Sequence, residues 1–222
     1  MSYYPILVDL EDRKVVIVGG GNVAQRKIDT LLEYHADIYI IAKDLTPALQ
    51  SYAKANRIQF LGPDLNESHL DGAFLVIAAT DDMHLNHKVG EMAKQRGLLI
   101  NAVDQPKDCS FIVPSVVKRG ELVIAVSTSG KSPALAKKIR QSLSDQFGDE
   151  YAEFLDLMGR IRKDILAQGF SQEENSRVFH ALVDSKALDA IAEKDWSLLT
   201  SILEKVLKNR FSREAVSNYI KG

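Results

Sequence analysis

The sequence predicts a doubly wound α/β fold followed by a helical domain, and three observations carry this prediction. The apolar run at residues 14–18 breaks into three glycines and then into helical spacing. Short apolar runs then alternate with helical patterns up to residue 103, which is typical of a parallel sheet buried on both faces. From residue 148 onward the apolar spacing is helical throughout. We therefore predict a Rossmann domain at residues 1–113, a small α+β segment at 114–147 and a helical C-terminal domain at 148–222.

The first predicted domain contains five strands joined by helical crossovers. Strands rich in β-branched residues suit a buried sheet, and parallel neighbours need a crossover between them. Two helical faces are visible in the apolar spacing, one made by Ala24, Ile28, Leu31 and Leu32, the other by Leu85, Val89, Met92 and Ala93. The predicted strands are residues 14–18, 37–42, 58–61, 73–80 and 98–103.

The second half begins with a strand at residues 121–126, a turn rich in Ser, Thr and Gly at 127–133, and a basic helix. The tail is predicted to be helical, with a break near Gly169. Its apolar faces are interpreted as the tail's own core, and a ligand groove is the alternative. The first face is predicted to be Tyr151, Phe154, Leu155 and Met158, and later helices lie around 173–184, 186–193, 195–208 and 212–220.

Composition and charge exclude several classes of protein. With 45% hydrophobic residues among 222 and a net charge of −2, nothing indicates a nucleic-acid partner. The longest apolar runs are too short to cross a bilayer and no secretory signal is visible, so we expect no membrane partner. Cys109 is the only cysteine, which excludes an internal disulfide and suits a cytoplasmic protein. The five histidines complete no zinc site, and we predict no bound metal.

The glycine turn after the first strand is predicted to bind a nucleotide phosphate. Gly19 permits the tight turn, Gly21 lets the main chain approach a pyrophosphate, and Ala24 occupies the close packing point between helix and strand. The amides near Asn22 and Val23 then face the phosphates from the positive end of the helix dipole. The alternative is a glycine turn of purely structural use.

Residues at the ends of two other strands are candidates for the rest of the nucleotide pocket. Asp44 follows the second strand, where an acidic residue holds the adenosine ribose, whereas Lys43 would neutralise the 2′-phosphate of NADP. We favour NAD. Thr80 and Asp81 end the fourth strand at the same sheet edge, with Asn86 one helical turn later. The alternative for Asp81 or Asp82 is a helix cap.

Asp104 follows the fifth strand and is a candidate general base beside the cofactor. Partial burial would raise the pKa of its carboxyl toward a useful value, and the alternative is an aspartate that caps the following Gln-Pro turn. Residues 114–140 hold six basic side chains against one acidic, a net charge of +5. Such a segment suits an anionic ligand that carries several carboxylates, and a solvated helix face is the alternative.

Five motifs follow one another along the first 140 residues. They are Val18-Gly-Gly-Gly-Asn-Val-Ala-Gln-Arg-Lys27, Ala78-Ala-Thr-Asp-Asp82, Asn101-Ala-Val-Asp104, Ser110-Phe-Ile-Val-Pro114 and Val126-Ser-Thr-Ser-Gly-Lys-Ser-Pro133. Together and in this order they resemble the precorrin-2 dehydrogenase and sirohydrochlorin ferrochelatase family, the N-terminal portion of siroheme synthase. The resemblance covers residues 1 to about 140, and the tail matches in helical character only.

The resemblance implies NAD-dependent oxidation of precorrin-2 to sirohydrochlorin, with Asp104 at the family's catalytic aspartate. In bifunctional members the same residue serves Fe²⁺ insertion. The fused methyltransferase portion of some siroheme synthases is not expected here. Asn22, Val23, Lys43 and Asp44 fall at the family's cofactor contacts, and we assign substrate binding to Asn101, Ser127, Thr128, Lys131 and Lys137.

The resemblance also implies a homodimer whose interface comes from residues 114–147, with the active site in a cleft between the domains and the partner subunit. The sequence departs from the family at Thr128, where a serine is usual, so a role that needs a serine there is in doubt. A hypothesis from another class is a non-catalytic NAD(H)-sensing dimer that signals through its helical tail. A third hypothesis is a dehydrogenase that acts on a smaller anionic metabolite.

Overall fold

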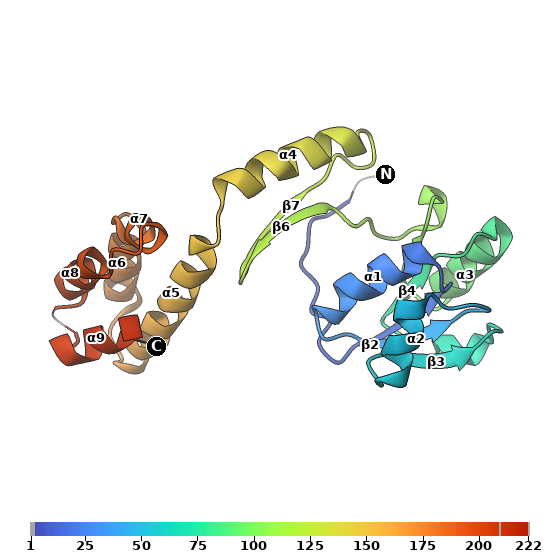
Figure 1. Ribbon diagram of the computed structural model, residues 1–222, viewed down its shortest axis with the longest axis horizontal. Coiled ribbons are helices and arrows are strands. Elements are labelled where there is room, and N and C mark those ends of the chain that lie inside the picture. Colours follow the sequence, from blue (N-terminus) through green and yellow to red (C-terminus); the bar gives the residue numbers. More distant parts are fainter. Residues whose placement is uncertain (1–2, 209, 222) are drawn as a thin grey trace. The chain divides into compact units, whose positions relative to one another are not determined.

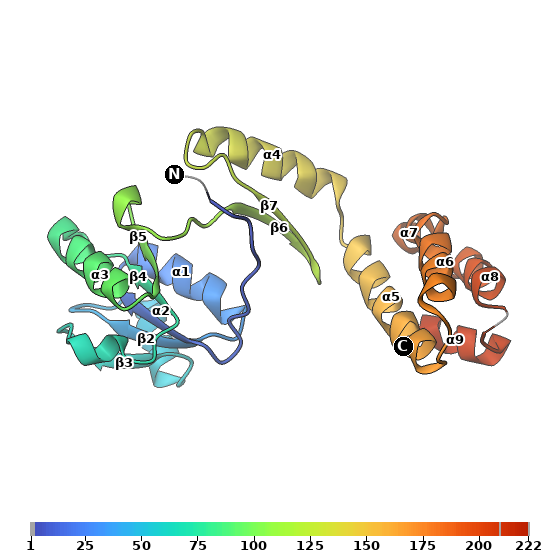
Figure 2. The ribbon, with the colours of Figure 1, turned by 180° about the vertical axis from the view of Figure 1, so that it is seen from behind.

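The computed structural model describes residues 3–208 and 210–221, and Figures 1 and 2 show its elements from opposite sides. The chain divides into two compact units, residues 1–113 and 114–222. The predicted division of the second unit at residue 147 stays a prediction, and the outermost positions, 1 and 222, lie outside the described residues. No described helix is both long enough and apolar enough to span a bilayer.

The first unit is built on a parallel sheet of five strands with the order β3-β2-β1-β4-β5. The chain thus starts in the middle, moves to one side, and returns past β1 to the other side, which is the doubly wound arrangement that the sequence predicts. The strands are β1 (Lys14–Val18), β2 (Asp37–Ile41), β3 (Gln59–Gly62), β4 (Leu75–Ala78) and β5 (Leu99–Ala102).

The uninterrupted apolar run of β1 is explained by burial on both faces of the sheet. Val15 and Ile17 belong to a core with α1 (Asn22–Leu32) and α2 (Pro47–Lys54), whereas Val16 and Val18 belong to a core with α3 (Met83–Gln95). Because neighbouring side chains of a strand point to opposite faces, the four buried positions from Val15 to Val18 are all apolar. Two short 3₁₀ turns complete the unit, η1 (Glu67–Leu70) and η2 (Pro106–Asp108).

The second unit begins with an antiparallel ribbon, β6 (Ser115–Arg119) and β7 (Leu122–Val126), against which α4 (Pro133–Gln146) packs (Figure 1). We did not predict β6, because its short sequence Ser-Val-Val-Lys-Arg gives too few alternations to indicate a strand. Pairing with β7 decides its conformation. Within 114–147, only Val117 and Ala136 are buried hydrophobic residues.

The remainder is a helical bundle with its own core. The first face of α5 is only partly as predicted: Phe154 is buried and Met158 packs against the core, but the buried stripe is Phe154, Leu157, Ile161 and Ile165. Tyr151 instead packs its ring on Phe147, with ring centroids 5.0 Å apart. The predicted break is present, since Gly169 has a φ of 73°. The helices are α5 (Glu150–Ala167), α6 (Gln172–Val183), α7 (Ala187–Ala192), α8 (Trp196–Leu207) and α9 (Arg213–Lys221).

Candidate functional site

The glycine turn lies at the topological switch point of the sheet. The chain leaves β1 toward β2 on one side, and β4 lies on the other, so a crevice is expected where the carboxyl ends of β1 and β4 meet. The Gly19 N–H donates to the Ile41 carbonyl oxygen at 2.8 Å, and the Ala79 N–H donates to the Val18 carbonyl oxygen at 2.7 Å. The turn is therefore fixed on both sides by the strands that frame the crevice.

The absence of a side chain has a different consequence at each of the three glycines. Gly19 has a φ of 120°, and a Cβ there would lie 2.3 Å from the Ala79 carbonyl oxygen. A Cβ at Gly20 would lie 2.0 Å from the Asp44 carbonyl oxygen, so this glycine, which we did not single out, is also required by packing. Nothing lies within 4 Å of a Cβ built at Gly21. The space in front of Gly21 is open to a ligand.

The N-terminus of α1 fits a phosphate group. Gly21 is the N-cap and offers no side chain to the first-turn amides of Asn22 and Val23, which leaves these donors to an external acceptor. Ala24 is fully buried against the sheet, as its predicted packing role requires. An uncapped helix start, open space at Gly21 and close helix packing together fit the pyrophosphate of a dinucleotide.

Polar residues follow the strands on both sides of the glycine turn. Lys43 and Asp44 follow β2 and are exposed. Asp82, and not Asp81, caps α3: its Oδ1 accepts from the His84 and Leu85 amides at 2.9 and 3.1 Å. These backbone hydrogen bonds hold the pKa of the Asp82 carboxyl below its ordinary value, and the Lys43 charge acts in the same direction. Lys43 therefore lies within electrostatic reach of the start of α3.

Thr80 is held by the buried side chain of Asn86. Thr80 donates to Asn86 Oδ1 through its N–H at 3.1 Å and its hydroxyl at 2.8 Å, and Asn86 Nδ2 donates to the Thr80 carbonyl oxygen at 2.9 Å. Asn86 is 2% exposed. It therefore acts as a support behind Thr80 instead of lining the crevice itself.

Asp104 lies two residues beyond β5, in a turn, with a φ of 60°. Asp104 is exposed, so our expectation that its carboxyl is partly buried is wrong. Among the described residues no hydrogen bond or ion pair to its carboxylate is found, which gives no support to a capping role. The carboxylate borders a pocket of about 430 Å³ with His84, His87, Gln105 and Asp108. Asp104 is available to a ligand in that pocket.

The sequence reasoning missed the pair formed by His87 and Asp108. His87 Nδ1 lies 2.8 Å from Asp108 Oδ2, and Asp108 is 8% exposed although it is charged. His87 is one of the five histidines for which the sequence predicts no metal site. The signal was an aspartate in the turn after β5, but nothing in the sequence shows that it meets α3. Across residues 3–208 and 210–221, no three His, Cys, Asp or Glu side chains are arranged to hold a metal ion.

The predicted substrate-binding residues are placed as follows. Asn101 donates to the Phe111 carbonyl oxygen at 3.3 Å, which fixes the loop after β5. In the second unit, Ser127 Oγ and Thr128 Oγ1 each accept a backbone N–H of their own turn at 3.0 Å, from Ser129 and Ser132. A threonine therefore suffices for this contact. The remaining two, Lys131 and Lys137, are exposed.

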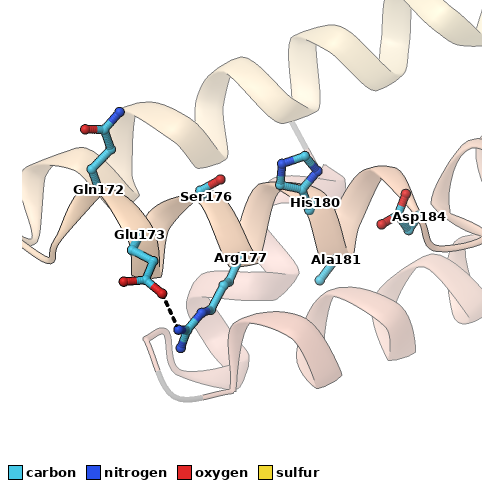
Figure 3. A pocket seen from close by; sticks show the side chains of 7 residues that line it. All are labelled: Gln172, Glu173, Ser176, Arg177, His180, Ala181 and Asp184. Atoms are coloured by element: carbon cyan, nitrogen blue, oxygen red, sulfur yellow. Dashed lines mark hydrogen bonds and ion pairs between the residues drawn. The ribbon is translucent and has the colours of Figure 1, made fainter.

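A second hollow, of about 850 Å³, lies along α6 of the helical bundle (Figure 3). Arg177 and Glu173 form an ion pair on its wall, and His180 and Asp184 lie further along the same helix. None of the residues that we predicted for the site line this hollow.

Comparison with known proteins identifies the family. Residues 6–115 match the family model described as "Putative NAD(P)-binding", and residues 119–146 match the one described as "Sirohaem biosynthesis protein central". The chain is 44% identical to siroheme synthase 1 of Serratia proteamaculans over 73% of this chain and 34% of that protein. It is 34% identical to siroheme synthase 1 of Pectobacterium atrosepticum over 100% of this chain and 46% of that protein.

Among solved structures, the chain is similar in fold to SirC, a precorrin-2 dehydrogenase, with a TM-score of 0.78 and 24% sequence identity. The match covers 93% of this chain and 100% of that one. The chain therefore belongs to the siroheme synthase family, as the resemblance of its motifs predicts, and it spans less than half the length of both relatives named above.

Proposed function

We propose that the protein catalyses the NAD-dependent dehydrogenation of precorrin-2 to sirohydrochlorin, a step of siroheme biosynthesis. The observation that carries the proposal is the juxtaposition of two groups at one edge of one sheet. The uncapped start of α1 at Gly21 follows β1, and the Asp104 carboxylate follows β5. Since the strands are parallel, both lie at their carboxyl ends.

The chain's own residues supply binding and proton transfer. The amides of Asn22 and Val23 bind the pyrophosphate, and Thr80, fixed by Asn86, lines the other wall. NAD, when bound, accepts the hydride. Asp104 accepts the proton that the substrate loses, since its carboxylate has no partner among the described residues and is free to act as a general base.

The same carboxylate suits the removal of pyrrole N–H protons as Fe²⁺ enters sirohydrochlorin, where Fe²⁺ is a substrate. The carboxylates of the tetrapyrrole have a suitable partner in the basic residues of 114–140, which include Lys131 and Lys137. We place the reaction in the cytoplasm, to which a single, thiol-bearing Cys109 is suited.

A homodimer is part of the proposal. A two-stranded ribbon is marginally stable by itself, and among the described elements β6–β7 is packed mainly against α4, with α5 in contact with β7. On α4, Leu135 and Ile139 remain 48% and 38% exposed. A second copy that covers this face would bury them, in keeping with the interface expected at 114–147.

Anaerobic assay of Asp104→Asn tests the function. Asparagine tolerates a φ of 60°, so the turn is expected to keep its shape. The wild-type protein with NAD⁺ and precorrin-2 should yield NADH and the sirohydrochlorin spectrum, and the variant should lose roughly 10²-fold or more of the rate, the usual contribution of a general base. NADH affinity should be unchanged.

Asp12→Asn is the matched control, because Asp12 is an exposed aspartate with a φ of 55° in the loop before β1. Addition of Fe²⁺ to sirohydrochlorin measures chelation separately. No NADH from the wild-type protein would refute the dehydrogenase, and an unchanged rate in Asp104→Asn would refute the assigned base. A change of oligomeric state with NADH, without turnover, would instead support the sensing module.

A further inference from the structure

The turn that carries Asp104 is held against one face of α3 by polar contacts at three levels. Gln105 Nε2 donates to the Met83 carbonyl oxygen at 2.8 Å, at the start of the helix. One turn later, His87 Nδ1 meets Asp108 Oδ2 at 2.8 Å. Near the end of the helix, Lys94 Nζ donates to the Lys107 carbonyl oxygen at 2.6 Å. The middle contact is an ion pair, and Lys94 Nζ also lies 3.5 Å from the other carboxylate oxygen of Asp108.

Gly90 allows this close approach. It lies between His87 and Lys94 on α3, and a Cβ built there would be 3.0 Å from the Asp108 Cβ. Such a distance is tighter than ordinary van der Waals contact. The absence of a side chain at Gly90 therefore lets η2 rest directly on the helix and lets the buried Asp108 reach His87.

Asp104 itself has a backbone conformation that needs support. Its φ of 60° is uncommon for a residue other than glycine, and such conformations persist where the surroundings hold them. On one side the Val103 N–H donates to the Ala78 carbonyl oxygen at 2.9 Å, which ties the turn to β4. On the other side the turn is tied through Gln105 and Asp108 to α3.

We propose that His87 and Asp108 are positioning residues: their ion pair fixes the turn that presents the Asp104 carboxylate to the substrate. The proposal rests on the proposed function for its catalytic consequence. His87 and Asp108 act through the backbone of 103–108, whereas Asp104 alone meets the reacting atoms. The pocket that Asp104, His87 and Asp108 share places all three at one edge of the sheet.

The charges around the pair give the contact a pH range. The hydrogen bond and charge of Asp108 raise the pKa of His87, Glu91 adds to this effect, and burial and Lys94 oppose it. The hydrogen bond of His87 lowers the pKa of Asp108, with Lys94 acting in the same direction. The ion pair is therefore complete between the ordinary pKa of aspartate and the ordinary pKa of histidine. It loses its charge as pH rises through the raised pKa of His87, and again in strong acid below the lowered pKa of Asp108.

Two variants and one control test the proposal. His87→Leu removes the contact at a helix position whose side chain is 54% exposed, and Asp108→Asn removes the charge while keeping the shape. Lys88→Leu introduces the same side chain at the next, exposed position of α3. Hydrogen–deuterium exchange of residues 103–110 and the pH profile of precorrin-2 oxidation are measured on the full chain, together with the affinity for NADH.

We expect both variants to exchange faster at residues 103–110 and to oxidise precorrin-2 about tenfold more slowly at mildly acidic pH, since small displacements of a catalytic group are costly. NADH affinity should not change, and Lys88→Leu should match the wild-type protein. The rate of the wild-type protein should decline as pH rises through the raised pKa of His87, and this decline should be absent from the pH profile of His87→Leu.

Exchange at 103–110 that is equal in all four proteins would overturn the proposal, as would a full rate and an unaltered pH profile in both variants. Exchange needs no substrate, so the two levels of failure are distinguishable. One further outcome is possible: the variants exchange faster, but the wild-type protein oxidises no precorrin-2. That result would support the contact and overturn its catalytic role together with the proposed function.

Discussion

The pair of substitutions Gly19→Ala and Gly21→Ala separates the structural from the ligand-binding use of the glycine turn. Both add one methyl group two residues apart. At Gly19 the new Cβ would lie 2.3 Å from the Ala79 carbonyl oxygen and 2.6 Å from the Ala79 carbonyl carbon, at a φ of 120°. At Gly21 the Cβ would meet nothing within 4 Å. We therefore predict opposite effects on folding and on binding.

The expected loss of stability is large at Gly19. The left-handed φ alone costs about 1–3 kcal/mol for a residue with a Cβ. The overlap is with backbone of β4, whose Ala79 N–H is bonded to Val18, so relief requires a shift of the sheet edge. A total of roughly 3–5 kcal/mol is expected, which is a large part of the about 5–15 kcal/mol that stabilises a typical domain.

The expected change of stability at Gly21 is near zero. Alanine can adopt its φ of −82° and ψ of −173° without strain. Because alanine lowers the conformational entropy of the unfolded chain, the substitution adds about 0.4–1 kcal/mol of stability. Loss of a favourable N-cap residue offsets this by about 0.5–1 kcal/mol. The methyl group nevertheless occupies the space where the pyrophosphate approaches, and a loss of about 1.4 kcal/mol or more in binding corresponds to at least about tenfold weaker NADH affinity.

Thermal unfolding and a fluorescence titration with NADH measure the two effects on the same protein samples. Gly21→Ala should unfold within a few degrees of the wild-type protein and bind NADH more weakly, whereas Gly19→Ala should unfold much earlier. Wild-type NADH affinity in Gly21→Ala would refute the inference that a pyrophosphate lies against this glycine.

Three further predictions concern other parts of the chain. Asn86→Ala should lower the free energy of unfolding by about 2–4 kcal/mol in a denaturant titration. The reason is that the Thr80 N–H and carbonyl oxygen lose a buried partner. A change below about 1 kcal/mol, the net contribution of one hydrogen bond, would contradict that account. Tyr219→Phe should cost about 1–2 kcal/mol by removing the hydrogen bond from the Tyr219 hydroxyl to Asp164 Oδ2. Burial, followed by that hydrogen bond, raises the pKa of Tyr219, so its contribution is complete below the ordinary pKa of tyrosine and is lost as pH rises above it; equal alkaline stability loss in both proteins would argue against this assignment. Ile139→Lys should convert a dimer to a monomer in light scattering, since it places a charge on the exposed face of α4, and an unchanged mass would speak against an interface there.

Much of the first unit was predictable because its signals are local. A strand segment buried on both faces must be apolar at every position, and the buried part of β1, from Val15 to Val18, meets that condition. The turn after it needs a left-handed φ at Gly19, which the sequence shows directly as glycine. Local period and local conformational preference together determine the sheet and the place of the nucleotide crevice.

The errors arose where two patterns fit the same residues. The predicted face, Tyr151, Phe154, Leu155 and Met158, has helical spacing. The stripe that the bundle buries, Phe154, Leu157, Ile161 and Ile165, has helical spacing too. Both stripes pass through Phe154, and only packing against α6, α7 and α9 selects one of them. Asp81 and Asp82 were equal candidates for the cap of α3 until the backbone placed the Asp82 carboxylate at the His84 and Leu85 amides.

The sequence by itself determined the order of the strands along the chain, the glycine turn and the candidate base, since each is written in a few consecutive residues. Only the tertiary structure decided which glycine is open to a ligand, that Asp104 is exposed in a left-handed turn, and that His87 meets a buried Asp108. These features depend on contacts between segments about 20 to 60 residues apart, such as Gly19 with Ala79 and His87 with Asp108. No local pattern records such contacts, because they are fixed by how the sheet brings the ends of its strands together.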